Sequence, residues 1–331
     1  MKNAKEYQIL FFEKLKESKS ENINPVYDIA NLLEISIDAA YRRLRGKTLL
    51  DFHEIIILCK YYNISIDEYV SANPYEVKFQ YMPIKRNDFM ENYKIYMKSL
   101  RNYLKSVVND PSKHKQILFA ATDIPIFHLC KFPILKAFKV YTWHKLFEKS
   151  DDSKFSSEDI ISSELVDIFK DISELYDKID SIEIWTSETI DTFLGSIKYF
   201  YEIGYFHSSE DVALICDQLN ALMEVLKQYG EKGYKQVGNN KSTFQLFLSE
   251  TDLENNLIYA ETDNSRICFI KLYSINTIST SNDIFCKEIK LWFDSIINKS
   301  ILISGFSQKQ FVLFFKDATR KINNLKNSLM C

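Results

Sequence analysis

Glycine and proline are scarce in this chain, which has only 7 and 6 of them among 331 residues. Glycine supplies the backbone conformations that tight hairpins and phosphate-binding loops require. Its scarcity favours long helices joined by short connections, and we therefore expect a mainly α fold. With 46% hydrophobic and 26% charged residues the composition is that of ordinary globular proteins, and the length predicts about two domains.

Long apolar runs are also missing. No stretch approaches the roughly 18 uncharged apolar residues of a membrane-spanning helix, and the start of the chain, Met1–Glu6, lacks the apolar core of a signal peptide. We therefore expect a cytoplasmic protein without a membrane partner. The 6 cysteines contain no C-x-x-C pair, so in a reducing compartment they are expected to be free thiols.

The signatures of the common catalytic sites are absent as well: the chain has no G-x-G-x-x-G, no Walker A loop, no H-E-x-x-H and no G-x-S-x-G. His128 and Cys130 are too few ligands to define a metal site, and a core or surface role is favoured for them. Glu183, Glu188 and Asp191 are interpreted as helix-cap and surface acids. The sequence thus predicts neither an enzyme nor a cofactor.

Positive charge is concentrated in one short segment. The net charge of −3 excludes a non-specific polycation. Arg42, Arg43, Arg45 and Lys47 nevertheless lie together, with no acidic residue from position 39 to position 50. Such a cluster suits the phosphates of nucleic acid. The role of Arg43, which lies nearer the side of its helix, stays open.

Short helices with recognisable caps fill residues 1–72. Asn24, Ser36 and Asp51 are residue types that cap helix starts, and Gly46 suits a helix end. Together with the apolar spacing they predict five helices, over residues 4–18, about 25–33, 36–45, from 51 onward and 65–70. These helices are expected to form one compact domain.

Six features keep the relative positions of a known motif: Ile29-Ala30, Leu33, Ile35-Ser36, Arg42, Leu44 and Gly46-Lys47. Residues 3–72 thereby resemble the λ-repressor-like (XRE-type) helix-turn-helix of transcription regulators. The resemblance implies that helix 36–45 is a recognition helix in the DNA major groove. Two positions depart from the family pattern: Glu34 stands in the turn where glycine is usual, and Ala40 stands where a larger β-branched residue often packs.

The recognition helix has an inner and an outer face. At 100° per residue, Ala40 and Leu44 fall on the inner side. On the outer side Ile37 would contact a thymine methyl group, Asp38 would accept a hydrogen bond from cytosine N4, and Arg42 would bind guanine O6 and N7. These three residues are the candidates for base recognition.

Other polar residues are candidates for phosphate contacts. Tyr41, Arg45 and Lys47 border the same face and would hold the DNA backbone. Asn24 and Ser36 lie at helix starts, where backbone amides and polar side chains also bind phosphate. The predicted partner is therefore double-stranded DNA.

Two functions remain open for this domain. The first is sequence-specific DNA binding by a transcription regulator, and the alternative is a protein-interaction module with the same fold and no DNA binding. They differ in whether binding requires Arg42 and Arg45 and weakens steeply with salt. Because one recognition helix covers only a few base pairs, the regulator is expected to act as a homodimer.

A linker is predicted at residues 73–84, followed by a helix-rich domain over 85–331 for dimerisation or for sensing an unknown ligand or protein. Its helices are expected at 86–109, 133–149, 157–178, 187–203, 209–231, 283–298 and 307–328. The β-branched and aromatic stretches 243–249, 257–262 and 266–278 predict a small antiparallel sheet.

The segment from Phe119 to Phe127, which contains Asp123-Ile124-Pro125, interrupts the helical pattern of the second domain. It is either a ligand loop or a buried connection. A buried connection is favoured.

Overall fold

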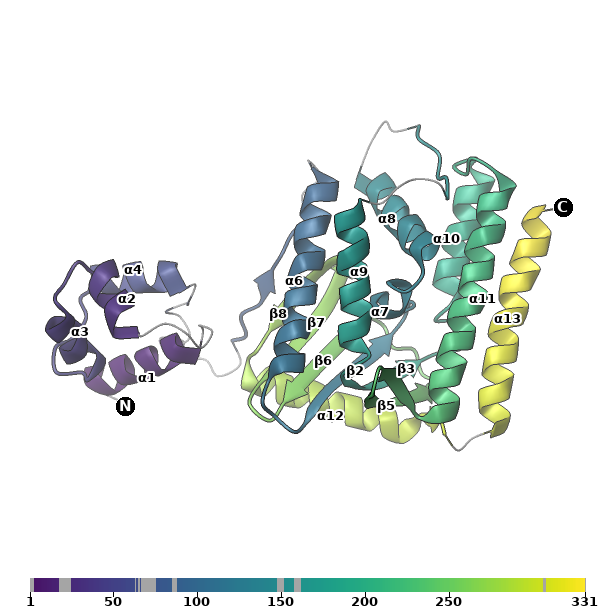
Figure 1. The fold of residues 1–331 in the computed structure, drawn as a ribbon. Helices are drawn as coiled ribbons and strands as arrows, with labels where there is room; N and C mark the ends of the chain where they lie inside the picture. Colours follow the sequence, from purple (N-terminus) through teal and green to yellow (C-terminus); the bar gives the residue numbers. More distant parts are fainter. Residues whose placement is uncertain are drawn as a thin grey trace. The chain divides into compact units, whose positions relative to one another are not determined.

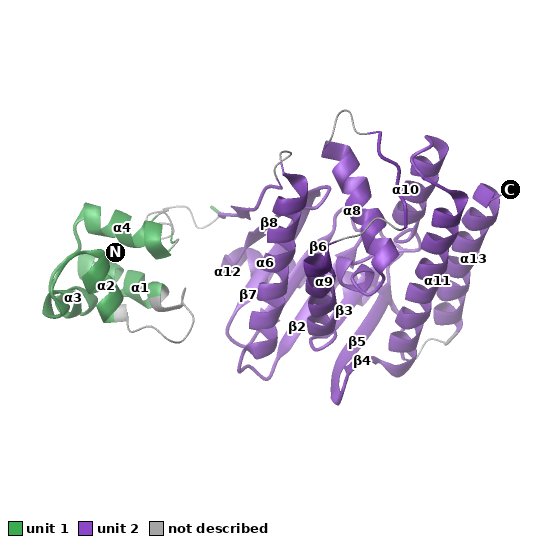
Figure 2. Ribbon diagram, turned by 45° about the horizontal axis from the view of Figure 1, so that its top comes forward, with its two compact units in different colours: residues 1–76 green, residues 77–331 purple. Residues whose placement is uncertain are grey.

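The computed structural model describes residues 3–17, 25–62, 64, 66, 76–84, 88–147, 152–157, 162–305 and 308–330. The chain divides into two compact units, residues 1–76 (unit 1) and 77–331 (unit 2), as Figure 2 shows. The division falls inside the segment 73–84 that the sequence predicts to be a linker.

Unit 1 is a helical body with an apolar core of its own. Its helices are α1 (Ala4–Glu17), α2 (Pro25–Leu32), α3 (Ile37–Leu44) and α4 (Phe52–Tyr62) (Figure 1). They bury one set of side chains, namely Phe11, Phe12, Leu15, Val26, Ile29, Ala30, Ala40, Leu58 and Tyr62. The turn predicted at 65–70 lies, apart from Ile66, outside the described residues.

Unit 2 is an α/β structure, and the expectation of a mainly α fold with a small antiparallel sheet is wrong. Of the described residues of the whole chain, 57% are helical and 17% lie in strands, in twelve helices and one nine-stranded mixed sheet. The strands are β1 (Gln80–Tyr81), β2 (Lys115–Ala121), β3 (Asp180–Trp185), β4 (Tyr234–Val237), β5 (Asn240–Leu248), β6 (Leu257–Thr262), β7 (Arg266–Tyr273), β8 (Asn276–Thr280) and β9 (Ile301–Leu302).

The sheet has the order β1-β8-β7-β6-β2-β3-β5-β4, with β9 paired to β5. Its centre is parallel, because β3 pairs in parallel with both β2 and β5. Parallel neighbours need long crossover connections. These are supplied by α7 (Ile126–Leu129), α8 (Pro133–Phe147) and α9 (Ser163–Tyr176) before β3, and by α10 (Asp191–Glu202) and α11 (Ser209–Lys232) before β5. The remaining pairings are antiparallel.

Helices cover both faces of the sheet, and the strands alternate accordingly. Leu118 and Ala120 of β2 pack in the cluster that contains Phe293 of α12 (Asp283–Lys299). Ile117 and Phe119, one residue out of phase with them, belong to the larger cluster under the other helices. Those helices include α6 (Phe89–Asn109) and α13 (Gln308–Met330), and Figure 1 shows α12 on the opposite side of the sheet.

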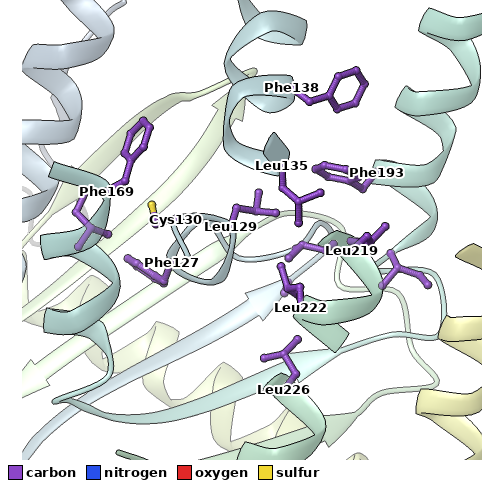
Figure 3. Packing of buried hydrophobic residues seen from close by; sticks show 14 of the residues in the cluster. Phe127, Leu129, Cys130, Leu135, Phe138, Phe169, Phe193, Leu219, Leu222 and Leu226 are labelled. Atoms are coloured by element: carbon purple, nitrogen blue, oxygen red, sulfur yellow. The ribbon is translucent and has the colours of Figure 1, made fainter. Parts of the chain in front are cut away.

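The larger cluster is the main core of unit 2. In Figure 3 side chains from α7, α8 and α11 converge above the sheet, among them Leu129, Leu135 and Leu222. All three are at most 1% exposed. Close packing of this kind supplies most of the stability of a domain, at roughly 25 cal/mol per Å² of apolar surface buried.

Two central strands, β2 and β3, lie where the sequence predicted no strand. The segment Ile117–Ala121 is apolar at every position and is buried on both faces, so it shows no period of two. In β3, Ser181 and Glu183 are polar but fully buried. β2 therefore lacks the alternation that marks a half-exposed strand. β3 does alternate, from Ser181 to Ile184, but the run is short and its polar residues are the buried ones.

Glu183 is the centre of a buried polar network, and its interpretation as a helix-cap or surface acid is wrong. Its carboxylate accepts hydrogen bonds from the hydroxyl of Tyr176 (2.6 Å) and Nε1 of Trp185 (2.9 Å), and lies 2.7 Å from Nε2 of His128. Burial raises the pKa of the carboxyl, but His128 and Tyr176 together hold it below its ordinary value. A buried carboxylate needs such partners.

No helix among the residues that the structure describes is long and apolar enough to span a bilayer.

Candidate nucleic-acid interface

Helices α2 and α3 are joined by a short turn, and each ends in the same type of cap. At the end of α2 the amide of Ile35 donates to the carbonyl of Ala30 (2.9 Å). At the end of α3 the amide of Lys47 donates to the carbonyl of Arg42 (2.8 Å). Both are Schellman motifs, in which the residue just beyond the helix adopts a left-handed backbone conformation.

Glu34 and Gly46 occupy these left-handed positions, with φ of 52° and 65°. The turn after α2 therefore keeps the conformation that glycine favours although a glutamate stands there. A left-handed residue with a Cβ costs about 1 to 2 kcal/mol. At Gly46 an added Cβ would also lie 2.8 Å from Cγ of Lys5. The glycine is therefore required at the end of α3, whereas the glutamate strains the turn.

Substitutions at the two positions are expected to have opposite effects on unit 1. Gly46→Ala should lower its free energy of unfolding by about 1 to 2 kcal/mol. Glu34→Gly should raise it by about 0.5 to 1 kcal/mol, because relief of the strain exceeds the entropy that glycine adds to the unfolded chain. Hydrogen exchange of the α2 and α3 amides in the full chain measures both changes. Shifts of the same sign would contradict the strain argument.

The inner side of α3 carries Ala40, which is fully buried in the core of unit 1. Ala30 of α2 lies in the same cluster and is 6% exposed. Two alanines at the crossing let the helix backbones approach closely. The departure from the family pattern at Ala40 thus leaves a packed helix crossing.

The outer side of α3 exposes every predicted base contact. Ile37 is 43% exposed, and the side chains of Asp38 and Arg42 are 79% and 56% exposed. Asp38 and Arg42 form an ion pair one turn apart, with 2.9 Å between Oδ2 and Nη2. An exposed pair of this kind contributes little stability. Both groups are therefore free to exchange partners at little cost.

Most of the predicted phosphate contacts border the same face. Tyr41, Arg45 and Lys47 are exposed, and the guanidinium carbon of Arg45 lies 5.6 Å from the centroid of the Tyr41 ring. Ser36 is the N-cap of α3 and its Oγ accepts a hydrogen bond from the amide of Ala39 (3.2 Å). Asn24 lies outside the described residues.

Arg43 turns toward α4 rather than to this face and is only partly exposed. Its guanidinium donates through Nε and Nη2 to the carboxylate of Glu54 on α4, at 2.6 to 3.1 Å. The two side chains are only 16% and 12% exposed. The hydrogen bonds to Glu54 raise the pKa of Arg43 above its ordinary value. The exposed positive charge near α3 is thus that of Arg42, Arg45 and Lys47.

Glu54 also caps α4. Its carboxylate accepts from the amide of Asp51 (3.1 Å), and the Asp51 carboxylate accepts from the amide of Glu54 (2.8 Å). This is a capping box, which satisfies amides that the first turn of a helix leaves unpaired. One carboxylate therefore ties the start of α4 to the last turn of α3.

Gln8 of α1 holds the end of α3. Its Nε2 donates to the carbonyls of Arg43 (2.7 Å) and Thr48 (2.8 Å), and its Oε1 accepts from the amide of Leu50 (2.8 Å). The residue is 7% exposed. Three hydrogen bonds from one buried amide fix the loop that carries Lys47, so Gln8 is a positioning residue.

Sequence reasoning missed Gln8 and Glu54. The spacing Asp51-x-x-Glu54 is a capping-box pattern and would have identified Glu54 as a cap. Nothing in the sequence indicates Gln8, because its partners are more than 30 residues away.

Comparison of the chain with protein-family models, with curated proteins and with solved structures gives no match.

Proposed function

We propose that the chain is a sequence-specific DNA-binding transcription regulator whose helix α3 enters the major groove. The observation that carries this proposal is that α3 has one exposed polar face and one side that other residues of unit 1 hold in place. Ile37, Asp38 and Arg42 are exposed on one face, while Gln8 and the Arg43–Glu54 pair hold the helix from behind. A rigid helix with an unengaged polar face suits recognition of base edges.

In the proposed complex Arg42 leaves Asp38, and both of its terminal nitrogens donate hydrogen bonds to guanine O6 and N7. Asp38 then accepts from cytosine N4, and Ile37 contacts a thymine methyl group. Tyr41, Arg45 and Lys47 bind phosphates along the groove, as does the start of α3 at Ser36.

The test begins with a library of random duplexes, together with the DNA upstream of the gene, from which the full chain selects its preferred site. Fluorescence anisotropy then compares variants on that site and on a random duplex. Arg42→Ala should cost about 1 to 3 kcal/mol on the preferred site and little on the random duplex. Lys47→Ala should weaken both alike and reduce the salt slope by about one.

Arg320→Ala is the matched control for Arg42→Ala, because Arg320 is similarly exposed, at 65% against 56%, and lies on α13 of unit 2. It should bind both duplexes as the parent does. If no duplex is enriched, or if Arg42→Ala and Lys47→Ala bind like the parent, DNA recognition by α3 is excluded. That outcome would favour the alternative, a module of the same fold that binds another protein.

We further propose that the regulator acts as a homodimer assembled through unit 2. A pair of recognition helices about 34 Å apart would cover two half-sites on one face of the duplex and recognise a palindrome. Light scattering of the full chain at micromolar concentration, with and without the selected duplex, measures the assembly state. A monomer under both conditions would contradict the dimer and leave DNA binding by α3 in place.

A further inference from the structure

A cavity of about 80 Å³ lies in unit 2 just beyond the end of β2. Its apolar walls include Phe119, Leu129, Trp143 and Phe269. In open α/β sheets, ligands bind outside the carboxyl ends of the parallel strands. The segment after β2 is such a position, and it contains the Asp123-Ile124-Pro125 break that the sequence singles out.

Three charged groups line this cavity. The ammonium group of Lys139 on α8 donates to Oδ2 of Asp123, and Nζ of Lys271 on β7 lies 4.0 Å from the same oxygen. The side chains of Lys139 and Asp123 are 9% and 7% exposed, and that of Lys271 is 31% exposed. The buried connection favoured from the sequence thus also supplies a carboxylate to a cavity.

The formal charges of these three groups do not cancel. Asp123 carries one negative charge, whereas Lys139 and Lys271 carry two positive charges, so the cavity has an excess of one positive charge. Burial lowers the pKa of Lys271; Asp123 opposes this effect and Lys139 adds to it. Lys139 and Asp123 are buried and Lys271 is only partly exposed, so water compensates the excess charge incompletely, and one further anionic group would balance it.

The shape of the cavity restricts what can carry that anionic group. An apolar cavity of about 150 Å³ holds benzene, so one of about 80 Å³ holds a body of about two to four carbons. The aromatic walls disfavour an ion that is polar on every side, such as inorganic phosphate. A monoanion with a short apolar body matches both the charge and the walls.

We propose that this cavity is a binding site for a short-chain monocarboxylate, with its carboxylate at Lys271 and Lys139 and its carbon chain against Phe119 and Trp143. The bound carboxylate completes two ion pairs from two lysines and two carboxylates. The site lies wholly in unit 2, and its occupation does not depend on the proposed DNA binding.

The probe is butyrate, and the control ligand is butyramide, which has the same carbon chain and no charge. Isothermal titration of the full chain at pH 7, at constant ionic strength and up to roughly 10 mM ligand, should give saturable one-to-one binding of butyrate. Butyramide should bind at least about tenfold more weakly, because it forms no charge-assisted hydrogen bond. Inorganic phosphate should give no saturable binding.

Lys271→Met tests the side chain that is least committed to Asp123. It should weaken butyrate binding at least about tenfold and leave the affinity for butyramide unchanged. Lys198→Met is the matched control: Lys198 lies on α10, outside the cavity lining, with its side chain 60% exposed, and this variant should bind butyrate as the parent does. Circular dichroism confirms that both variants are folded.

Three results would overturn the proposal. The first is that butyrate does not bind the parent, the second is that butyrate and butyramide bind equally, and the third is that Lys271→Met retains the parent affinity for butyrate. Preferential binding of phosphate would also overturn it, since the site would then select charge alone. The comparison of the two ligands on the parent chain needs no variant, so it stands even if Lys271→Met fails to fold.

Discussion

Replacement of Arg43 by alanine is expected to lower the free energy of unfolding of unit 1 by about 3 kcal/mol. The reason is that Glu54, only 12% exposed, keeps its negative charge and loses the guanidinium that compensates it. Removal of one partner from a buried ion pair is costly because the other charge stays buried. Hydrogen exchange of the α3 and α4 amides in the full chain measures the loss.

Arg42→Ala is the matched control, since Arg42 is the neighbouring residue on the same helix. Its side chain is 56% exposed and its partner Asp38 is 79% exposed, so the stability should change by less than about 0.5 kcal/mol. Equal losses from the two variants would show that the Arg43–Glu54 pair does not hold α3 on α4.

A double replacement separates the cost of the unpaired Glu54 charge from the cost of losing the Arg43 side chain. In Arg43→Met combined with Glu54→Gln neither charge remains, and glutamine still accepts the Asp51 amide in the capping box. Most of the stability lost in Arg43→Ala should therefore return. If it does not, the ion pair and its hydrogen bonds are themselves a net source of stability, because methionine retains the apolar stem of Arg43.

The same comparison bears on function. At a temperature where unit 1 remains folded, Arg43→Ala should retain the preference for the selected duplex, whereas Arg42→Ala should lose it. Two adjacent arginines would thus differ completely in role. The difference follows from 100° of rotation along α3.

The helices of unit 1 could be located from the sequence because their signals are local. Ser36 caps α3 and Gly46 ends it, within ten residues of each other, and the apolar spacing between them gives the buried face at Ala40. The exposure of Ile37, Asp38 and Arg42 follows from the same period. What the sequence could not indicate is which arginine pairs inward, because that depends on Glu54 from the next helix.

Two strands at the centre of the sheet, β2 and β3, could not be predicted, because β2 has no alternation and the short alternation of β3 has its polar residues buried. β2 is buried on both faces, and β3 places Glu183 at 0% exposure among partners from distant elements. Glutamate side chains are exposed to solvent at most positions in folded proteins, so a glutamate in a sequence predicts an exposed site. Only the positions of His128 and Tyr176, fixed by the fold, make its burial tolerable. The parallel pairings join segments about 60 residues apart, and sequence periodicity carries no information on them.

A buried lysine in unit 2 gives the last prediction. Lys136 of α8 is fully buried, and its Nζ has no hydrogen-bond partner among the described residues. It lies over the aromatic rings of Phe169, Tyr93 and Trp143, at 4.7, 5.6 and 5.8 Å from their centroids. Burial lowers the pKa of Lys136 from 10.5 to about 8, and the neighbouring Cys130 only partly opposes this shift.

The shift corresponds to a cost of about 3 kcal/mol for the charged form in the folded state. Cation–π attraction to the three rings offsets about 1 kcal/mol of this cost. Lys136→Met keeps an unbranched side chain and removes the charge. It should therefore raise the free energy of unfolding of unit 2 by about 2 kcal/mol at pH 7.

The pH dependence of this gain in stability tests whether the charge of Lys136 causes it. Between pH 8 and 10.5 the unfolded chain binds a proton at Lys136 that the folded chain does not, so the stability of the parent rises with pH across this window. Below pH 8 both states are protonated and the full cost is present. The advantage of Lys136→Met should accordingly shrink between pH 7 and pH 10. Urea denaturation followed by tryptophan fluorescence reports unit 2 alone, because Trp143, Trp185 and Trp292 all lie there.

Lys235 provides the contrast that makes this prediction specific. Its pKa is lowered further, to about 7, mainly by burial. Its Nζ, however, donates to the carbonyls of Tyr176 (2.9 Å) and Ile179 (2.7 Å), so Lys235→Met would remove two buried hydrogen bonds. We expect no gain in stability from Lys235→Met at pH 7. If both methionine variants are stabilised equally, desolvation alone governs these lysines; if Lys136→Met is destabilised, its ammonium group is held by an interaction stronger than the three rings supply.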